Sequence, residues 1–382
     1  MSANTQVVII GAGVGGLACA KRLSGHSDLV DVTVIGQAAS HDFAPSFLWL
    51  LDGARSEEQV SRPARGIERY GATFINDAVL SVDPDAQVVR TASSEHHYDQ
   101  LIVAPGAELD PGSIDGLAQT SHFFFTRDDA TRLADALKTF AGGRVLLVIP
   151  ALPYKCPAAP YEAAFLIDAL LRKRGVDAQI EIRTIEPQPM PVAGPKIGKR
   201  VADLLKKRGI SYHTGQKLLR IDSDRAVAVF EQGEVSFDLL VAVPPHRAPG
   251  FIRSSPFAGP SGWVPVDEHT LVVPSYENVH AIGDVTSIML ANGKPLPKAG
   301  VFAHAQAEVV ADNIVAQARG AQPSATFDGH GTCFLEIGHG KAGLASGNFY
   351  ATPDPNIRMF PPSRLGHLGK VLFERRWLRQ LR

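Results

Sequence analysis

The sequence has few cysteines and no apolar run long enough to cross a bilayer. Only three cysteines occur among 382 residues, so any disulfide is expected to be catalytic rather than structural. The longest apolar runs, such as VLLVI at 145–149, fall far short of the roughly 20 residues that a spanning helix needs. The histidines show no metal-ligand spacing with cysteines or carboxylates, so no metal site is expected.

The chain also has no large excess of positive or negative charge. The formal net charge is −1, which argues against nucleic acid as a partner of the whole protein. The N-terminal residues run into an apolar strand pattern without a charged and apolar leader, so no secretory signal is expected and the cytoplasm is the default compartment. The length and the 45% hydrophobic content predict about two to three domains with sizeable cores.

A dinucleotide-binding turn lies near the start of the chain. Residues 7–10 predict a buried strand directly before Gly11, Gly13 and Gly16, and an Ala/Leu helix pattern follows. Gly11 permits the tight turn, Gly13 lets a pyrophosphate approach, and Gly16 lets the helix pack closely on the strand. Cys19 in this helix is expected to be an inert packed side chain.

Two later motifs support FAD as the cofactor, although a third position departs from the usual pattern. The second strand ends at Gly36, where an acidic ribose ligand is usual, so ribose binding is expected from the backbone or from elsewhere. Two further strand ends resemble FAD motifs of two-domain flavoenzymes: the turn Ala104, Pro105, Gly106, and Gly283 with Asp284 after the strand ENVHAI. Their combination with the first glycines predicts an FAD site.

A second βαβ unit lies between the later FAD motifs. Strands at 144–149 and 178–185 alternate with helices at 158–174 and 195–208, which predicts a second Rossmann-like domain. Its first turn, PALPYKCP, lacks glycines, and Pro150, Pro153 and Pro157 have no N–H to donate. We therefore expect a domain that does not bind a nicotinamide nucleotide.

Cys156 in that turn is the candidate that reduces the flavin instead. It lies just before a predicted helix and next to Lys155, and both features favour a thiolate. Cys333 could complete a redox dithiol. Two unrelated packed thiols remain the alternative.

The chain resembles the sulfide:quinone oxidoreductase family and its relative, the flavoprotein subunit of flavocytochrome c sulfide dehydrogenase. The similarity rests on GAGVGG, FAPSFLWLLDG, YKCPAAPYE, GWVPVDEHTL, GKPLPKAGVFAHAQA and Cys333. It implies an α/β fold of two Rossmann-like domains plus a C-terminal membrane-associating region. The expected parts are an FAD-binding domain at 1–107 and 262–320, a second domain at 108–261, and a C-terminal region at 321–382.

The resemblance also implies roles for individual residues. Cysteines matching Cys156 and Cys333 flank the isoalloxazine, take up sulfide sulfur and pass two electrons to the flavin, which reduces a quinone. Lys298 matches a lysine beside the flavin pyrimidine and the quinone, where a cation stabilises the reduced flavin. Glu162 matches a glutamate that could accept a proton, although a helix-surface acid is as good an interpretation. Further cofactor-binding residues implied are Pro45, Ser46 and Val79.

Some family features are missing, which keeps alternatives open. Residues 121–133 contain His122 but lack the third cysteine of many members and the histidine that follows it, and 187–195 lacks another histidine. HDFAPSFLW has no cysteine for covalent flavin attachment, which favours a quinone over a cytochrome as acceptor. The alternatives are a cytochrome-linked sulfide dehydrogenase, a type II NADH:quinone dehydrogenase and a flavin-dithiol redox sensor without turnover. A homo-oligomer is also left open.

The last 19 residues form a basic amphipathic tail. Six basic residues against one acidic residue give this tail a net charge of +5. Leucines recur at spacings of three and four, with Phe373 and Trp377 broadening the apolar face. Such a helix predicts interfacial anchoring at the cytoplasmic side of a membrane, and docking on the protein's own core is the alternative. The preceding segment TPDPNIRMFPPSR is expected to be an extended connector, and Phe334, Ile337 and Phe360 are expected at the quinone entrance.

Overall fold

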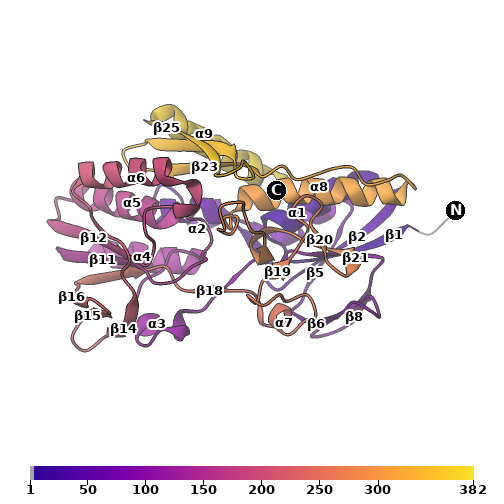
Figure 1. Ribbon diagram of the computed structural model, residues 1–382, viewed down its shortest axis with the longest axis horizontal. Coiled ribbons are helices and arrows are strands. Elements are labelled where there is room, and N and C mark those ends of the chain that lie inside the picture. Colours follow the sequence, from indigo (N-terminus) through magenta and orange to yellow (C-terminus); the bar gives the residue numbers. More distant parts are fainter. Residues whose placement is uncertain (1–3) are drawn as a thin grey trace.

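The computed structural model describes residues 4–382 and contains two separate parallel sheets, one in each half of the molecule (Figure 1). The first sheet has the strand order β20-β21-β9-β1-β2-β5, parallel except for β20. Helices α1 (Val14–Leu23) and α8 (Gly300–Ala318) pack against each other beside it. Its strands are β1 Thr5–Ile10, β2 Val30–Gly36, β5 Thr73–Asn76, β9 Gln100–Val103, β20 Val272–Val273 and β21 Tyr276–Ala281.

The second sheet has the order β13-β12-β11-β17 and is parallel throughout. Its strands are β11 Gly143–Ile149, β12 Ala178–Thr184, β13 Ser211–His213 and β17 Leu239–Ala242, and its main helices are α4 Arg127–Thr139, α5 Ala159–Lys173 and α6 Pro195–Arg208. The predicted strand and helix pairs of this unit are confirmed to within about two residues, the usual uncertainty of element ends. The α/β fold with two Rossmann-like domains is confirmed.

Short elements complete the two halves. Two three-stranded antiparallel sheets, β6-β7-β8 and β14-β15-β16, lie along one edge of the molecule (Figure 1). Their strands are β6 Val79–Asp83, β7 Val88–Thr91, β8 Glu95–His97, β14 Leu218–Asp222, β15 Val227–Phe230 and β16 Gly233–Ser236. The remaining short elements are β3 Ser40–Asp42, α2 Glu57–Val60, β4 Ser61–Pro63, β10 Glu108–Leu109, α3 Leu117–Thr120, β18 His246–Arg247, α7 Gly250–Arg253, β19 Val264–Pro265 and β22 Thr286–Ser287.

The C-terminal region is a small sheet followed by a helix. Antiparallel strands β23 (His330–Glu336), β24 (Ala342–Asn348) and β25 (Asn356–Ser363) precede α9 (Arg364–Leu378). The expected extended connector is therefore wrong in part, because β25 pairs with β24 instead of running free. None of the helices within residues 4–382 is both long and apolar enough to cross a membrane.

The end of the chain returns to the first domain. Trp377, Leu378 and Leu381 are buried in the same apolar cluster as strands β1 and β2, while the first half of α9 lies over β24. The C-terminal region thus contacts both halves of the molecule. The second half of the tail adopts the docked alternative, because its aromatic and leucine side chains face the protein's own core.

Candidate functional site

The first glycine turn contacts the Ala104 turn directly. Gly11 has a φ of +107°, and a Cβ there would lie 2.2 Å from the carbonyl oxygen of Ala104. A Cβ on Gly16 would lie 1.9 Å from the carbonyl oxygen of Gly11, so both positions exclude larger residues. Gly13 precedes α1 as its N-cap and has no described atom within 4 Å of a Cβ position. The backbone is therefore open to a ligand where a pyrophosphate would approach.

Asp284 supplies an acceptor oxygen that has no hydrogen-bond partner among residues 4–382. Its Oδ1 is buried and accepts no hydrogen bond from residues 4–382. Burial raises the pKa of this carboxyl, whereas the charges of Lys155 and Lys298 lower it. The backbone of the preceding Gly283 is fixed by a 2.7 Å hydrogen bond to Oε1 of Gln306. A hydroxyl-bearing ligand such as the ribitol chain of FAD would satisfy Asp284, so the residues present fit this cofactor.

The other predicted FAD residues lie around this turn. A Cβ on Gly36 would stand 2.9 Å from Cβ of Ala12 in the glycine turn, and the N–H of Asp77, just before Val79, donates to the carbonyl of Gly36. Gly106 ends the Ala104 turn, and Pro45 lies in the 3-10 helix Ala44–Leu50. Ser46 is buried there and donates a 2.8 Å hydrogen bond to Glu374 of α9, so its hydroxyl already has a partner. Direct contact of these residues with the cofactor stays a prediction.

The loop that carries Cys156 is bound to Lys298. The N–H of Cys156 donates a 2.6 Å hydrogen bond to the carbonyl of Lys298. Cys156 itself adopts a φ of +54°, an uncommon backbone conformation for a residue with a side chain. The ammonium of Lys298 is buried, donates to the carbonyls of Asp284 (2.6 Å) and Thr286 (3.1 Å), and stands 3.5 Å from the ring centre of Trp263. Two predicted catalytic residues are thus brought together with the predicted FAD acid.

The two redox candidates also lie close to one another. Cys156 is open to solvent on one side and Cys333, on β23, is partly open, but protein surrounds both thiols elsewhere. Burial, followed by the nearby Cys333 and Glu162, raises the pKa of Cys156 to about 12. Burial and then Glu162 raise the pKa of Cys333 to about 11. Each thiol thus lies within electrostatic reach of Glu162 and Lys370, and their action as a redox pair stays a prediction.

The expectation of a thiolate at Cys156 is wrong for the protein as folded. The N–H of Ala159, at the start of α5, lowers the pKa of the thiol as expected, but desolvation is the larger effect. The cation that helps to lower this pKa is Lys370 of α9, whereas Lys155 lies 6.0 Å from the ring centre of Phe125 and is itself desolvated. Both cysteines are therefore protonated thiols at neutral pH.

Glu162 forms a buried ion pair with Lys370. Their exposed fractions are 5% and 4%, and Nζ of Lys370 donates to Oε1 of Glu162. Oε2 of Glu162 accepts a 3.2 Å hydrogen bond from the N–H of Glu336 on β23, and Lys370 also lies over the ring of Trp49 at 4.7 Å. The helix-surface interpretation of Glu162 is therefore wrong.

Sequence reasoning missed Lys370, which it counted with the basic residues of the tail. The position of Lys370 on the helix could have identified it as a buried residue. Lys370, Glu374, Trp377 and Leu381 recur at spacings of three and four, so the lysine shares the inward face with two large apolar residues. A cation on such a face needs a buried partner.

Sequence reasoning also missed Glu186, just beyond β12. It is 1% exposed and accepts hydrogen bonds from the hydroxyls of Tyr161, Tyr154 (3.0 Å) and Thr184 (3.3 Å). An acid at this place in a Rossmann unit holds the ribose of a bound nucleotide. Here tyrosines on either side of Cys156 bind it instead, and the expected loss of the nicotinamide nucleotide stays a prediction.

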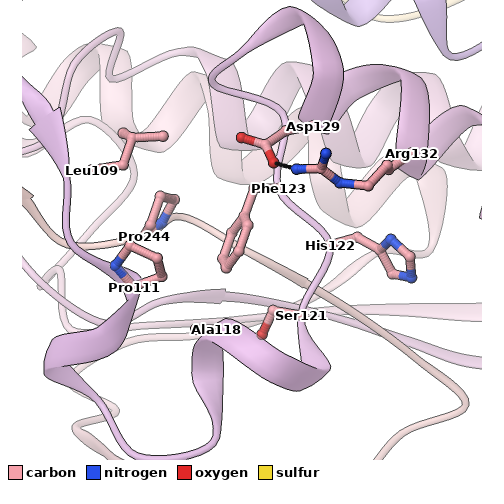
Figure 2. A pocket seen from close by; sticks show the side chains of 9 residues that line it. All are labelled: Leu109, Pro111, Ala118, Ser121, His122, Phe123, Asp129, Arg132 and Pro244. Atoms are coloured by element: carbon pink, nitrogen blue, oxygen red, sulfur yellow. Dashed lines mark hydrogen bonds and ion pairs between the residues drawn. The ribbon is translucent and has the colours of Figure 1, made fainter.

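A hollow of about 230 Å³ lies near Leu109 and Pro244, where the chain passes between the two halves of the molecule (Figure 2). None of the predicted site residues lines it, and Ser121, His122 and Phe123 form part of its wall. Figure 2 shows the carboxylate of Asp129 paired with Arg132 at one side. Burial lowers the pKa of Lys155, and the charge of Asp129 is one of those that oppose this shift, so Asp129 lies within electrostatic reach of the Cys156 loop.

Comparisons with known proteins agree with this geometry. Residues 5–309 match the family model described as pyridine nucleotide-disulphide oxidoreductase. The mitochondrial sulfide:quinone oxidoreductase of Mus musculus is 28% identical over 93% of this chain and 80% of its own length. The sulfide-quinone reductase of Aquifex aeolicus is 28% identical over 99% of this chain and 91% of its own length.

The solved sulfide:quinone oxidoreductase of Aquifex aeolicus superimposes with a TM-score of 0.89 at 27% identity, covering 99% of this chain and 91% of that structure. These matches confirm the resemblance stated from the motifs, and with it FAD as the cofactor. Together with the glycine turns and the unpartnered acid, they show that the chain belongs to the pyridine nucleotide-disulphide oxidoreductase family, as an FAD-dependent oxidoreductase similar to sulfide:quinone oxidoreductases.

Proposed function

We propose that this protein oxidises sulfide through Cys156 and Cys333 and passes two electrons by way of FAD to a quinone. The observation that carries the proposal is the position of the thiols. Cys156 lies within electrostatic reach of Cys333, and its backbone is bound to Lys298, which in turn binds the backbone of Asp284. Bound FAD supplies the two-electron transfer between the dithiol and the quinone.

The oxidation state of the cysteines determines which sulfur attacks. Hydrosulfide is an anion near neutral pH, whereas the two sulfurs of the oxidised cysteine pair are bonded to each other and carry neither a proton nor a free thiolate. Hydrosulfide therefore attacks one sulfur of the oxidised cysteine pair. A new S–S bond forms to that cysteine, the bond between Cys156 and Cys333 breaks, and the other cysteine leaves with the electron pair. The ammonium of Lys370, which lowers both pKa values, stabilises that leaving thiolate, and Glu162 is placed to take up a proton.

Aromatic side chains beside Cys333 support a quinone entrance. Phe334 and Phe360 both lie opposite Leu344 on the central strand β24. Phe334 lies 6.2 Å, centre to centre, from the ring of Phe373 on α9. Two of the three expected entrance residues thus gather here, whereas Ile337 packs against the core of the second domain.

An exposed apolar face on α9 supports peripheral attachment at the cytoplasmic side of a membrane. Leu365, Leu368 and Leu372 are 79%, 51% and 56% exposed, which is unusual for leucines on one helical face. Quinones dissolve in bilayers, so a protein that reduces them benefits from lying on the lipid surface.

An anaerobic mixing experiment tests the proposal. Sulfide should bleach the visible band of bound FAD in wild type, and a quinone analogue should restore it. Cys156→Ala should retain FAD and lose bleaching by sulfide, whereas the matched Cys19→Ala variant, whose thiol is buried in the first domain, should behave as wild type. Bleaching by NADH would point to a type II NADH dehydrogenase. Bleaching by sulfide without reoxidation by quinone would point to a sensor or a cytochrome-linked enzyme.

A further inference from the structure

A pocket of about 370 Å³ lies between α9 and the segment that carries α2 and β4, and arginines dominate its wall. Glu374 neutralises one of them, because Nη2 of Arg55 lies 2.6 Å from its Oε2. Four further arginines line the same pocket: Arg62, Arg375, Arg379 and Arg382. The pocket therefore holds more positive than negative charge.

These remaining arginines have little to neutralise them. Within the described part of the chain, ion pairs engage Arg55 but not Arg375, Arg379 or Arg382. Arg62 is held in place by the backbone, since Nη1 donates to the carbonyls of Glu58 and Ser61 at 2.9 and 2.5 Å. Partial burial and the charge of Arg382 lower the pKa of Arg62. A bound anion would relieve this crowding of like charges.

The pocket continues the exposed apolar face of α9. Leu365, Leu368 and Leu372 are followed by Arg375 and Arg379 at spacings of three and four residues, which places all five on one side of the helix. Apolar side chains thus occupy the first half of this face and guanidinium groups the second half. Such an arrangement matches a molecule that has an apolar part and an anionic head.

We propose that this arginine pocket binds the phosphate group of an anionic phospholipid, while the leucines of α9 contact its acyl region. Guanidinium groups bind phosphate oxygens through paired N–H donors, which makes arginine well suited to the task. The proposal rests on the proposed membrane attachment and adds selectivity for anionic lipid to it.

Vesicle flotation of the purified FAD-bound protein tests this. Wild type should bind vesicles of phosphatidylcholine with phosphatidylglycerol more tightly than vesicles of phosphatidylcholine alone. Arg375→Gln with Arg379→Gln should weaken binding to the anionic vesicles roughly 25-fold. Arg62→Gln, on the opposite wall, should weaken it about fivefold, because the pocket needs both walls. Reduction of FAD by sulfide should be unchanged in all three proteins.

Two controls separate the pocket from general charge and from membrane attachment. Arg220→Gln with Arg225→Gln removes the same charge from β14 and its turn, which lie at the opposite edge of the molecule from α9 (Figure 1), and should leave binding unchanged. Leu368→Ser with Leu372→Ser should lose binding to both kinds of vesicle.

Several outcomes would overturn the pocket. They are equal binding of wild type to neutral and anionic vesicles, an Arg62→Gln variant that binds as wild type, or tighter binding of soluble glycerol phosphate than of anionic vesicles, which would identify a free phosphate ester as the ligand. The first would leave membrane attachment standing. Failure of wild type to bind either vesicle would overturn both proposals.

Discussion

The ammonium of Lys370 donates a hydrogen bond to the carboxylate of Glu162, which joins the C-terminal helix α9 to the first turn of α5 across 208 positions of sequence. Both side chains are buried, and both influence the pKa of Cys156 and of Cys333. The helix expected to serve as a membrane anchor is therefore also part of the candidate active site. One face of α9 contributes Lys370, and another is exposed.

Lys370→Met should destabilise the protein strongly. Without the ammonium, Glu162 would hold a buried charge with no cation beside it, and breaking a buried pair from one side costs about 3–5 kcal/mol. The measurement is the free energy of unfolding of the FAD-bound protein in urea. Adding Glu162→Gln to Lys370→Met should restore part of the loss.

A surface pair provides the control for that experiment. Lys199→Met removes the partner of Asp203, and the side chains of this pair are 75% and 59% exposed, so the cost should stay below about 0.5 kcal/mol. Equal losses for Lys199→Met and Lys370→Met would contradict the buried ion pair.

The two active-site thiols should react slowly with alkylating agents at neutral pH. With pKa values of about 12 and 11, Cys156 and Cys333 hold few thiolates, and alkylation should be more than about tenfold slower than for the same cysteines in the unfolded chain. The rates, followed by mass spectrometry of the cysteine peptides after reduction, should keep rising as the pH passes 9. A plateau below that pH would mean that a thiolate is present after all.

Glu186 should make the protein less stable as the pH rises. Burial raises the pKa of this carboxyl from 4.5 to about 7, so the folded state holds a proton that the unfolded chain releases. The stabilisation is complete below about pH 4.5 and is lost as the pH rises through about 7. A shift of this size corresponds to about 3 kcal/mol. Wild type should therefore lose stability relative to Glu186→Gln across this window in chemical denaturation, and parallel pH profiles would refute the assignment.

Local sequence signals predicted the framework well. Gly11, Gly13 and Gly16 follow a strand and open a helix, and such a turn depends on residues close together in the chain. The prediction that the second domain does not bind a nicotinamide nucleotide rests on a local signal of the same kind, because prolines stand where glycines are usual in the corresponding turn.

Features that depend on tertiary packing could not be predicted from local sequence signals. The amphipathic pattern of α9 does not say which of its faces packs on the protein, and in the structure one side is buried while the other is exposed. The prediction of a thiolate from the sequence neighbours of Cys156 is wrong for the same reason, because burial in the folded protein has the largest effect on the pKa of this thiol. The hydrogen bonds of Tyr154 and Tyr161 to Glu186 likewise join residues that follow two different strands or lie in a helix.

Lys298 should make the reduction potential of bound FAD depend on pH around 8. Burial lowers the pKa of this ammonium to about 8 despite the nearby Asp284, so its positive charge is lost as the pH rises through that value. If Lys298 lies beside the flavin as proposed, loss of the charge removes a cation that favours the reduced state. In a potentiometric titration, the potential of Lys298→Met should lie on the order of 30 mV below wild type at neutral pH and converge with it above pH 8. Lys294→Met, which changes a lysine bound to the carbonyl of Pro191, should follow wild type throughout. Curves for Lys298→Met and wild type that coincide at every pH would show that this ammonium does not act on the flavin.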